Sequence, residues 1–464
     1  MEFRNLTEKE FKKISDNHPL MNFHQTIEWG NLKEKSGWKK HLVGIIDKKE
    51  IICASLLLEK PTPLKKSIFY APRGPLIDFN NKELLIEFTK EIKKYIKENK
   101  GIFLKIDPYV INQERDRQGQ VVPNQIDNRE VVKTLKDLGY KHFGYNLYQE
   151  TMQPRWIYTL NINNRSIEEI LKDMDSKTRQ IIRKNEKSSI ICREITYDDL
   201  PKFKDIMKHT GDRREFIDRP LSYYQNMYTS LKENESIKFL FAELHTKIFL
   251  KDLSKEIKEL QKEFDSNKEK KESDKFKFNE IKFNKRQAEI VVNLTRLNNK
   301  IEDITKLKEQ YGDVIVLGGI VFLINKNEVL SLYGGTYKEF MYLQSPYTLH
   351  YEMIKYAVSH NCNRYNFYGI TGDFKDTNPM YGLYLFKSGF GGEVTELIGE
   401  FDLIINKPYY YLYKISFYIY QNLKRLKAKI IKEEDNVSCL PFFVIKLCLA
   451  SGGRYLLFST KPIF

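Results

Sequence analysis

The chain repeats one order of predicted helices and strands, and this repeat limits its fold more than any other feature. In the first half, residues 78–98 carry apolar side chains at helical spacing, and residues 102–110 form a buried strand. The pattern starts again near the middle of the chain, with a strand at 156–162, a helix at 167–188 and a strand at 237–244. We therefore predict an α/β (α+β) protein in which two copies of one unit pack side by side.

The length of the chain, 464 residues, suits two or three domains with substantial cores. Its 41% hydrophobic and 13% aromatic residues indicate a globular protein rather than a disordered one. The predicted parts are a first domain at 1–152 that is completed by about 398–432, a second domain at 153–397, a helical arm at 247–312 and an atypical tail at 433–464.

A heptad pattern interrupts the second copy. Apolar residues three and four positions apart run from Leu250 to Phe264 and, after a polar stretch, from Phe283 to Ile304. Because the chain must return to complete the domain, the two helices are predicted to fold back as an antiparallel coiled-coil hairpin with lysine-rich flanks. The pattern does not decide between an RNA-binding arm and a spacer or dimerisation arm, so a homodimer stays open.

The stretch from Asn366 to Val394 contains six glycines and is predicted to be a functional loop between two strands. Glycine costs roughly 0.5–1 kcal/mol inside a regular element, so this density indicates tight turns or close approach to a ligand. Hairpin turns without a ligand explain the glycines equally well. Lys387 lies in this stretch between Phe386 and Ser388, and we predict that it is the functional cation of the stretch.

Charge and cysteine content limit the partners and the compartment. Lys and Arg outnumber Asp and Glu by 77 to 62, which suits a polyanionic partner such as RNA, an anionic membrane surface or a pyrophosphate. An AT-rich genome, which enriches lysine in the proteins it encodes, explains the excess of basic residues equally well. Five scattered cysteines and eight histidines show no ligand spacing, so no metal is expected. The first residues lack a secretory signal pattern, which predicts a cytoplasmic protein.

Motifs spread along the chain resemble the Fem family of peptidoglycan interpeptide-bridge aminoacyltransferases. The glycine-rich stretch supplies NFYGITGDF and PMYGLYLFKSGFGGEVTELIGEFDL. Earlier motifs, in the family's order, are HQTIEWGNLKEKSGW, YAPRGPLID, QPRWIYTLNI, KTRQIIRKNEK and FIDRPLSYYQNMY. Together they cover the chain from about residue 20 to about residue 425. The resemblance implies tandem domains similar to the GNAT acyltransferase fold, with the helical arm as a frequent insertion.

The resemblance also implies an activity and its partners. Such enzymes move an amino acid, here expected to be glycine, alanine or serine, from aminoacyl-tRNA to the stem peptide of a cell-wall precursor. The acceptor is either lipid II or UDP-MurNAc-pentapeptide, and no cofactor is expected. In the family the arm is proposed to meet tRNA.

Catalytic candidates follow from the chemistry and from the resemblance. Aminoacyl transfer needs a cation near the developing oxyanion and a proton acceptor. No serine or cysteine nucleophile is paired with a histidine, which favours direct attack by the acceptor amine. The resemblance places Lys387 and the preceding Phe386 near the reacting centre. Asp107 matches the family's strand-end aspartate, which is a candidate base, although Asp-Pro is also an ordinary turn signal.

The resemblance also supplies candidates for binding the acceptor. Arg219 and Tyr223 match a pair that contacts phosphate and sugar, and Lys33 lies near the position of a phosphate-binding lysine. Lys35 remains an alternative to Lys33. Tyr333 matches a less certain substrate tyrosine. Each of these residues has an ordinary structural interpretation as a surface ion pair or a packed aromatic. Arg73 and His350 are expected to be structural.

The C-terminal region and two other functions remain open. Residues 407–432 form one basic, tyrosine-rich helix that either lies on the inner membrane leaflet or packs on the first domain. The tail has no apolar run near the ~20 residues of a membrane span.

Two alternative functions remain open. One is an N-acyltransferase that uses acyl-coenzyme A, although its glycine-rich phosphate loop is missing. The other is a non-catalytic tRNA-binding or scaffold protein.

Overall fold

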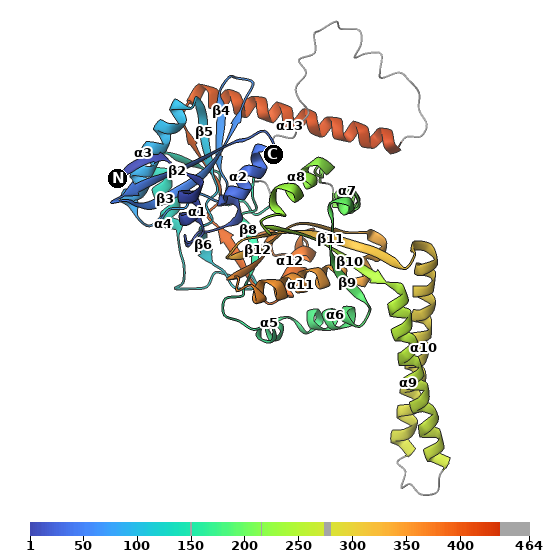
Figure 1. Ribbon diagram of the computed structural model, residues 1–464. Helices are drawn as coiled ribbons and strands as arrows, with labels where there is room; N and C mark the ends of the chain where they lie inside the picture. Colours follow the sequence, from blue (N-terminus) through green and yellow to red (C-terminus); the bar gives the residue numbers. More distant parts are fainter. Residues whose placement is uncertain (149–150, 215, 273–279, 437–464) are drawn as a thin grey trace. The chain divides into compact units, whose positions relative to one another are not determined.

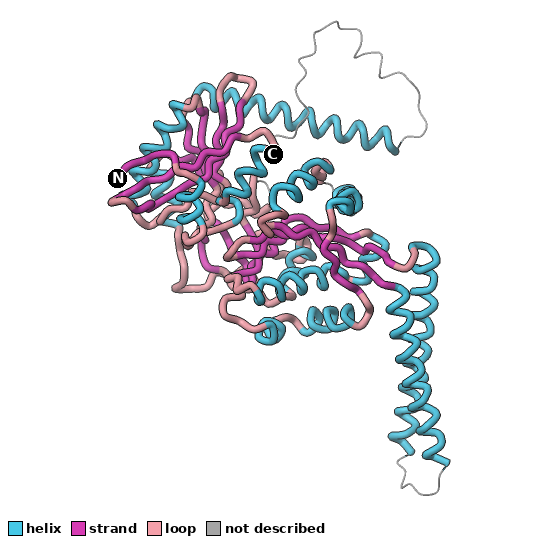
Figure 2. The backbone as a smooth tube through the Cα atoms, viewed as in Figure 1, coloured by secondary structure: helices cyan, strands magenta, loops and turns pink. Residues whose placement is uncertain are grey.

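The structure is a computed structural model, and it describes residues 1–148, 151–214, 216–272 and 280–436. It divides into two units, Met1–Ile405 and Asn406–Phe464, which are treated separately below. Figures 1 and 2 show the elements along the chain. Most of the predicted tail, from residue 437 onward, lies outside the described residues.

The first sheet gathers strands from both ends of the chain. Its order is β1-β2-β3-β4-β5-β15-β7, and only β4 and β5 run parallel to each other. The strands are β1 (Glu2–Asn5), β2 (Lys39–Asp47), β3 (Glu50–Pro61), β4 (Ser67–Ala71), β5 (Gly101–Ile106), β15 (Phe401–Ile404) and β7 (Tyr140–His142).

The second sheet has the order β6-β14-β8-β13-β12-β11-β10-β9, and again one neighbouring pair, β12 and β13, is parallel. The strands are β6 (Ile111–Glu114), β14 (Glu393–Leu397), β8 (Trp156–Asn161), β13 (Arg364–Gly369), β12 (Glu328–Thr336), β11 (Val314–Ile324), β10 (Ile237–His245) and β9 (Ile190–Glu194).

The helices complete the repeat. In each copy two helices follow the first strand, and one long helix joins the parallel pair: α1, α2 and α3 in the first copy match α7, α8 and α11 in the second. This correspondence confirms the predicted α/β class with two copies of one unit. The helices are α1 (Glu8–Ser15), α2 (Ile27–Glu34), α3 (Lys82–Glu98), α4 (Arg129–Asp137), α5 (Ile167–Asp173), α6 (Ser176–Glu186), α7 (Leu200–Arg214), α8 (Leu221–Leu231), α11 (Ser345–Ser359) and α12 (Tyr381–Ser388).

Local sequence explains why these helices begin and pack where they do. Thr7 and Ser166 each form a capping box with the glutamate three residues later, which satisfies backbone N–H groups at the starts of α1 and α5. Along α3, Leu84, Phe88 and Ile92 recur at helical spacing and are all buried against the first sheet. Burial of such a side chain contributes about 1.5–3 kcal/mol, so the apolar stripe holds the helix on its sheet.

The two copies exchange strands. β6 belongs to the first half of the chain but pairs with β14 in the second sheet, while β15 follows the second copy and pairs with β5 and β7 in the first sheet. The predicted return of residues 396–406 to the first copy is confirmed for β15. The exchange of β6 was not predicted, because a strand of four residues with three polar side chains has little apolar pattern.

The inserted arm consists of α9 (Thr246–Glu272) and α10 (Glu280–Tyr311), which lie side by side in Figures 1 and 2. Ile290, Leu297 and Ile304, spaced by seven residues, are buried between the helices. Arg286 Nε donates to Glu263 Oε1 across the pair at 2.7 Å. The predicted antiparallel coiled-coil hairpin is confirmed. It begins and ends on neighbouring strands, because Thr246 N donates to Asp313 O at 3.0 Å.

Three local predictions were wrong. The predicted single helix at 167–188 breaks into α5 and α6, because Arg179 donates to the last carbonyls of α5 and thereby ends that helix. The strand-like segment at 145–154 is not a strand among its described residues. The predicted loop at 366–394 contains helix α12, whose Tyr384 and Lys387 are buried three residues apart on one face.

The second unit is represented by α13 (Lys407–Asn436). Tyr411, Ile415 and Tyr418 lie at helical spacing on it and are exposed. Within the described ranges, none of the helices has the length and apolar content needed to cross a membrane.

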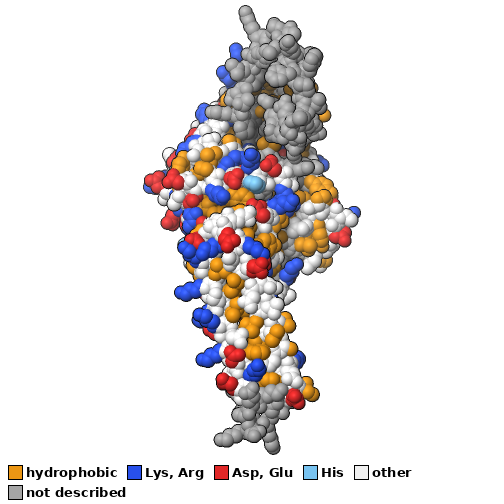
Figure 3. Space-filling view, turned by 90° about the vertical axis from the view of Figure 1, so that its right-hand side faces the viewer, with side chains coloured by type: hydrophobic (Ala, Val, Ile, Leu, Met, Phe, Trp, Pro, Cys, Tyr) orange, Lys and Arg blue, Asp and Glu red, His pale blue; other side chains and the backbone are white. Residues whose placement is uncertain are grey.

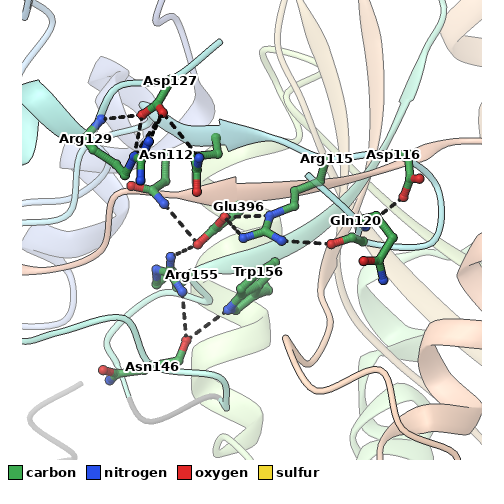
Figure 4. Close-up of polar contacts among 12 residues, drawn as sticks. Asn112, Arg115, Asp116, Gln120, Asp127, Arg129, Asn146, Arg155, Trp156 and Glu396 are labelled. Carbon is green, nitrogen blue, oxygen red and sulfur yellow. Dashed lines mark hydrogen bonds and ion pairs between the residues drawn. The ribbon is translucent and has the colours of Figure 1, made fainter. Parts of the chain in front are cut away.

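Glu396 on β14 joins the exchanged strand to the second sheet (Figure 4). Its carboxylate accepts hydrogen bonds from Asn112 at 3.1 Å and from Arg115 Nε at 2.8 Å, and it forms an ion pair with the buried Arg155. Trp156 Nε1 donates to Asn146 O nearby at 2.9 Å. One buried carboxylate thus neutralises two arginines, one from the predicted first domain and one from the start of the second.

We predict that Glu396→Gln lowers the free energy of unfolding by about 3–5 kcal/mol, because it leaves the buried Arg155 without a compensating charge. Arg129→Gln is the matched control. Arg129 forms an exposed ion pair with Asp127, and such pairs contribute about 0.2–1 kcal/mol. Urea denaturation of both variants tests the difference, and equal destabilisation would contradict the assigned role of Glu396.

Candidate active site

Lys387 is held in the last turn of α12 and points its amine at the end of β13. Its Nζ donates to the carbonyl oxygens of Phe367 at 2.6 Å and Gly369 at 2.7 Å. Only 7% of its surface is exposed, and burial lowers its pKa to about 7. An ammonium group has three donors, and among the described residues the third finds no acceptor. The amine is therefore positioned and has one donor left for a ligand.

The end of β13 is a break in the second sheet. β12 and β13 pair only from Glu328 to Leu330 and from Arg364 to Asn366, although both strands continue further. Buried carbonyl groups that leave a ladder need another donor. Lys387 supplies that donor at Phe367 and Gly369, which lie just beyond the paired segment.

An aromatic cluster surrounds this lysine. Phe386 packs against Tyr347 with ring centres 4.8 Å apart and against His350 at 5.4 Å. His350 is buried, and burial together with the Lys387 charge lowers its pKa to about 3. Its Nδ1 lies 2.7 Å from the Tyr365 hydroxyl. His350 is therefore a neutral packed residue, as expected from its place on an amphipathic helix.

Asp107 lies at the end of β5 and is 2% exposed. Its two oxygens accept hydrogen bonds from Arg73 N at 2.6 Å and from the Tyr70 hydroxyl at 2.9 Å. Burial raises its pKa to about 7, against the opposing charge of Arg73. Arg73 donates to Pro154 O at 2.7 Å. This arrangement fixes the turn around Arg73, while the role of Asp107 as a proton acceptor stays a prediction.

The four predicted acceptor-binding residues come together where α2 and α8, the corresponding helices of the two copies, pack against each other. Lys33 Nζ lies 5.6 Å from the ring centre of Tyr223, and the Arg219 guanidinium lies 5.4 Å from the same ring. The ring centres of Tyr223 and Tyr333 are 6.5 Å apart. Two cations and two tyrosines thus share one site, although their roles stay predictions.

The electrostatics of this cluster suit an anion. Lys33 Nζ also lies 4.4 Å from the ring centre of Trp29. Burial is the main cause that lowers the pKa of Lys33 to about 8; Tyr333 opposes this shift and the charge of Arg219 adds to it. In the described part of the chain, no carboxylate forms an ion pair with Lys33. Lys35, the alternative, has its Nζ 3.5 Å from the Thr229 hydroxyl in an exposed contact.

Sequence reasoning missed Tyr368. Its φ of 65° lies in the left-handed region, which is unusual for a bulky side chain and often marks functional sites. Its ring is half-buried, its hydroxyl donates to Gln153, and its pKa is raised, chiefly by burial. Tyr368 also lies within electrostatic range of Arg73, Tyr333 and Asp107. Its place directly before Gly369 in the glycine-rich stretch was the available signal.

Comparisons with known proteins agree with this arrangement. The model of the FemAB family matches residues 6–416. Aminoacyltransferase FemA of Staphylococcus epidermidis is 33% identical over 429 residues, which cover 92% of this chain and all of the relative. FemA of Staphylococcus aureus is 32% identical over 432 residues, covering 93% and 100%. The crystal structure of FemX aligns with a TM-score of 0.74 at 27% identity and covers 89% of this chain and 99% of that one.

The fold and the site thus define a two-copy α/β transferase. The chain belongs to the FemAB family. The resemblance inferred from the motifs is confirmed, as is the α/β fold of two repeated units with an inserted coiled-coil hairpin. As a member of this family the chain is classed as an aminoacyltransferase, the activity in the names of its relatives.

We predict that Lys33→Ala weakens the binding of inorganic pyrophosphate by roughly 10- to 100-fold, because hydrogen bonds to charged groups contribute about 1.5–3 kcal/mol. Lys35→Ala, which removes the same charge from a neighbouring position, serves as the control. Wild-type affinity should also fall as the pH rises through about 8, where Lys33 loses its proton. Calorimetric titration measures both effects, and a stronger effect of Lys35→Ala would favour the alternative lysine.

Proposed function

We propose that the protein transfers an amino acid from aminoacyl-tRNA to the stem peptide of a peptidoglycan precursor and thereby builds an interpeptide bridge. The amino acid is glycine, alanine or serine, and the acceptor is lipid II or UDP-MurNAc-pentapeptide. The names of the FemA relatives support aminoacyl transfer. The observation that carries the proposal is the position of Lys387, a buried amine with one donor left at a break in the sheet.

The acceptor cluster suits the phosphate end of such a precursor. A pyrophosphate offers several charged oxygens, which Arg and Lys bind through charge-assisted hydrogen bonds. Lys33 is half-buried near a second cation, Arg219, so an anion between them offsets their mutual repulsion. The hydroxyl groups of Tyr223 and Tyr333 supply neutral donors for phosphate or sugar oxygens.

The reaction joins the acceptor amine to an ester carbonyl. A C–N bond forms, the C–O bond to the terminal ribose of the tRNA breaks, and the proton lost by the amine ends on the ribose oxygen. The charged form of Lys387 stabilises the oxyanion that develops on the carbonyl oxygen, through its third N–H. Phe386 and its aromatic neighbours keep water from the ester. The carboxylate of Asp107 accepts a hydrogen bond from Arg73 N and so fixes the turn that contains Arg73, near Tyr368. We propose that this carboxylate accepts the proton of the attacking amine before the proton passes to the ribose oxygen.

The two alternative functions have less support. An acyl-coenzyme A enzyme needs a cation for the pyrophosphate of that donor, and the nearest sequence candidate, Arg179, already donates to the carbonyls of Leu171 and Lys172. A non-catalytic RNA-binding scaffold gives no reason to bury the Lys387 amine, since an uncompensated buried amine is costly.

The direct test supplies total charged tRNA, with one amino acid radiolabelled at a time, together with lipid II or UDP-MurNAc-pentapeptide. We expect the label of one amino acid to enter one acceptor. Acetyl-coenzyme A as donor is the parallel arm. Absence of transfer from every charged tRNA by a folded protein would overturn the proposed function.

We predict that Lys387→Met lowers the turnover of this reaction by about 10²–10³-fold, the usual cost of removing an oxyanion donor. The ratio of wild-type to variant activity should fall as the pH rises through about 7, because the charged amine is lost there. Between about pH 7 and 10 the unfolded chain binds one more proton at Lys387 than the folded chain, so wild-type stability should rise with pH more steeply than that of the variant. A ratio that rises with pH would assign the neutral amine as a base instead.

A further inference from the structure

A cavity of about 440 Å³ lies at the root of the arm. Phe249 from the start of α9 and Ile304 from α10 form part of its apolar lining, together with Leu343 from the short 3-10 helix at Lys338–Leu343. The end of α6 and the loop after it close the other side through Asn185 and Ser188. Neither the predicted site residues nor the acceptor cluster line this cavity.

Three lysines line the same cavity: Lys184, Lys300 and Lys306. Lys306 is compensated, because it forms an ion pair with Glu302 at 2.6 Å. Across the described ranges, no carboxylate forms an ion pair with Lys184 or Lys300. Lys300 Nζ instead lies 4.4 Å from the ring centre of Phe249. Two cations without an ion-pair partner thus share a cavity with an aromatic ring.

The two cations repel each other. Burial is the main cause that lowers the pKa of Lys300, followed by the charge of Lys184, and Arg296 acts in the same direction. The carboxylate of Glu256, on α9, acts on Lys300 in the opposite direction. Asp303 is the acidic residue that lines the cavity. A bound anion between Lys184 and Lys300 would replace their repulsion with two attractions.

The cavity connects to the reacting centre through two packed elements. Asn185 donates to Gln344 O and to Thr348 Oγ1, both at 3.1 Å, and so ties α6 to the start of α11. Tyr347, between these two residues, packs on Phe386 next to Lys387. A chain of packed residues, from Asn185 through the start of α11 to Phe386, thus links the cavity lining to the residue before Lys387.

We propose that this cavity binds a phosphodiester and the attached base from the single-stranded 3′ end of the donor RNA. Lys184 and Lys300 contact the phosphate, and the exposed Tyr342 contacts the base, while the buried Phe249 packs under Lys300. Proteins commonly bind single strands in this way, with cations on the backbone and aromatic rings on the bases. Figure 3 shows further Lys and Arg side chains on this face of the molecule and along the arm, mixed with acidic ones. The proposal rests on the proposed function, since it takes RNA as the donor.

The test measures how a fluorescent single-stranded RNA with a 3′ CCA end binds to the full chain carrying Lys184→Gln and Lys300→Gln. We expect affinity to fall on the order of tenfold at moderate salt. The slope of log affinity against log salt should become shallower by about 0.7, because the two lysines neutralise one phosphate and each neutralised phosphate of a single strand contributes about 0.7 to that slope. The KM for aminoacyl-tRNA should rise with turnover unchanged.

The matched control carries Lys39→Gln and Lys90→Gln, two exposed lysines of the first copy, and has the same net charge. Melting temperatures of all variants establish that they are folded. Equal RNA affinity and equal KM in the two double variants would overturn the cavity proposal. If the wild-type protein still transfers the amino acid in that case, the proposed function stands. Equal binding of AMP and the RNA would assign the cavity to a free nucleotide and also overturn the proposal. Absence of wild-type transfer would instead overturn the proposed function.

Discussion

The exchange of β6 and β15 between the two sheets is the constraint on which the rest of the first unit depends. The first sheet depends on β15, which lies between β5 and β7, and β6 extends the edge of the second sheet. Glu396 holds the β6 crossing by neutralising Arg115 and Arg155 together. Separation of the copies would break three ladders and one buried charge cluster, so the site residues of both copies keep fixed relative positions.

That fixed relation explains how the site is assembled. Lys33 comes from the first copy, Tyr223 and Tyr333 from the second, and they meet because α2 and α8 hold corresponding places in the repeat. The repeat therefore sets two equivalent helices against each other, and their facing residues include a cation from one copy and a tyrosine from the other. Asp107 and Lys387 show the same logic, since each lies beside the end of the fifth strand of its copy.

Periodicity and motif resemblance predicted the repeat, the arm, the return of β15 and the residues of the acceptor cluster. These features depend on apolar spacing or on local residue order, both of which are visible in one chain. The exchange of β6, the break between α5 and α6 and the position of Tyr368 depend on tertiary contacts: a ladder to β14, the Arg179 side chain on the last carbonyls of α5, and a strained backbone beside Asp107. Spacing carries no record of such contacts. The helix α12 was hidden by Gly382 within it and Gly389 at its end, and burial of Tyr384 offsets the helical cost of Gly382.

The place of the arm in the repeat has a further consequence. In the first copy the equivalent strands β2 and β3 are joined directly by Lys48 and Lys49, both with positive φ as in a tight hairpin turn. In the second copy the same connection carries α9 and α10, yet His245 still pairs with Val314 at the base. The second sheet therefore contacts the arm only at its two ends. The entropic cost of bringing those ends together grows slowly with the number of residues between them. The length of the arm beyond its root can therefore change without any rebuilding of the second sheet.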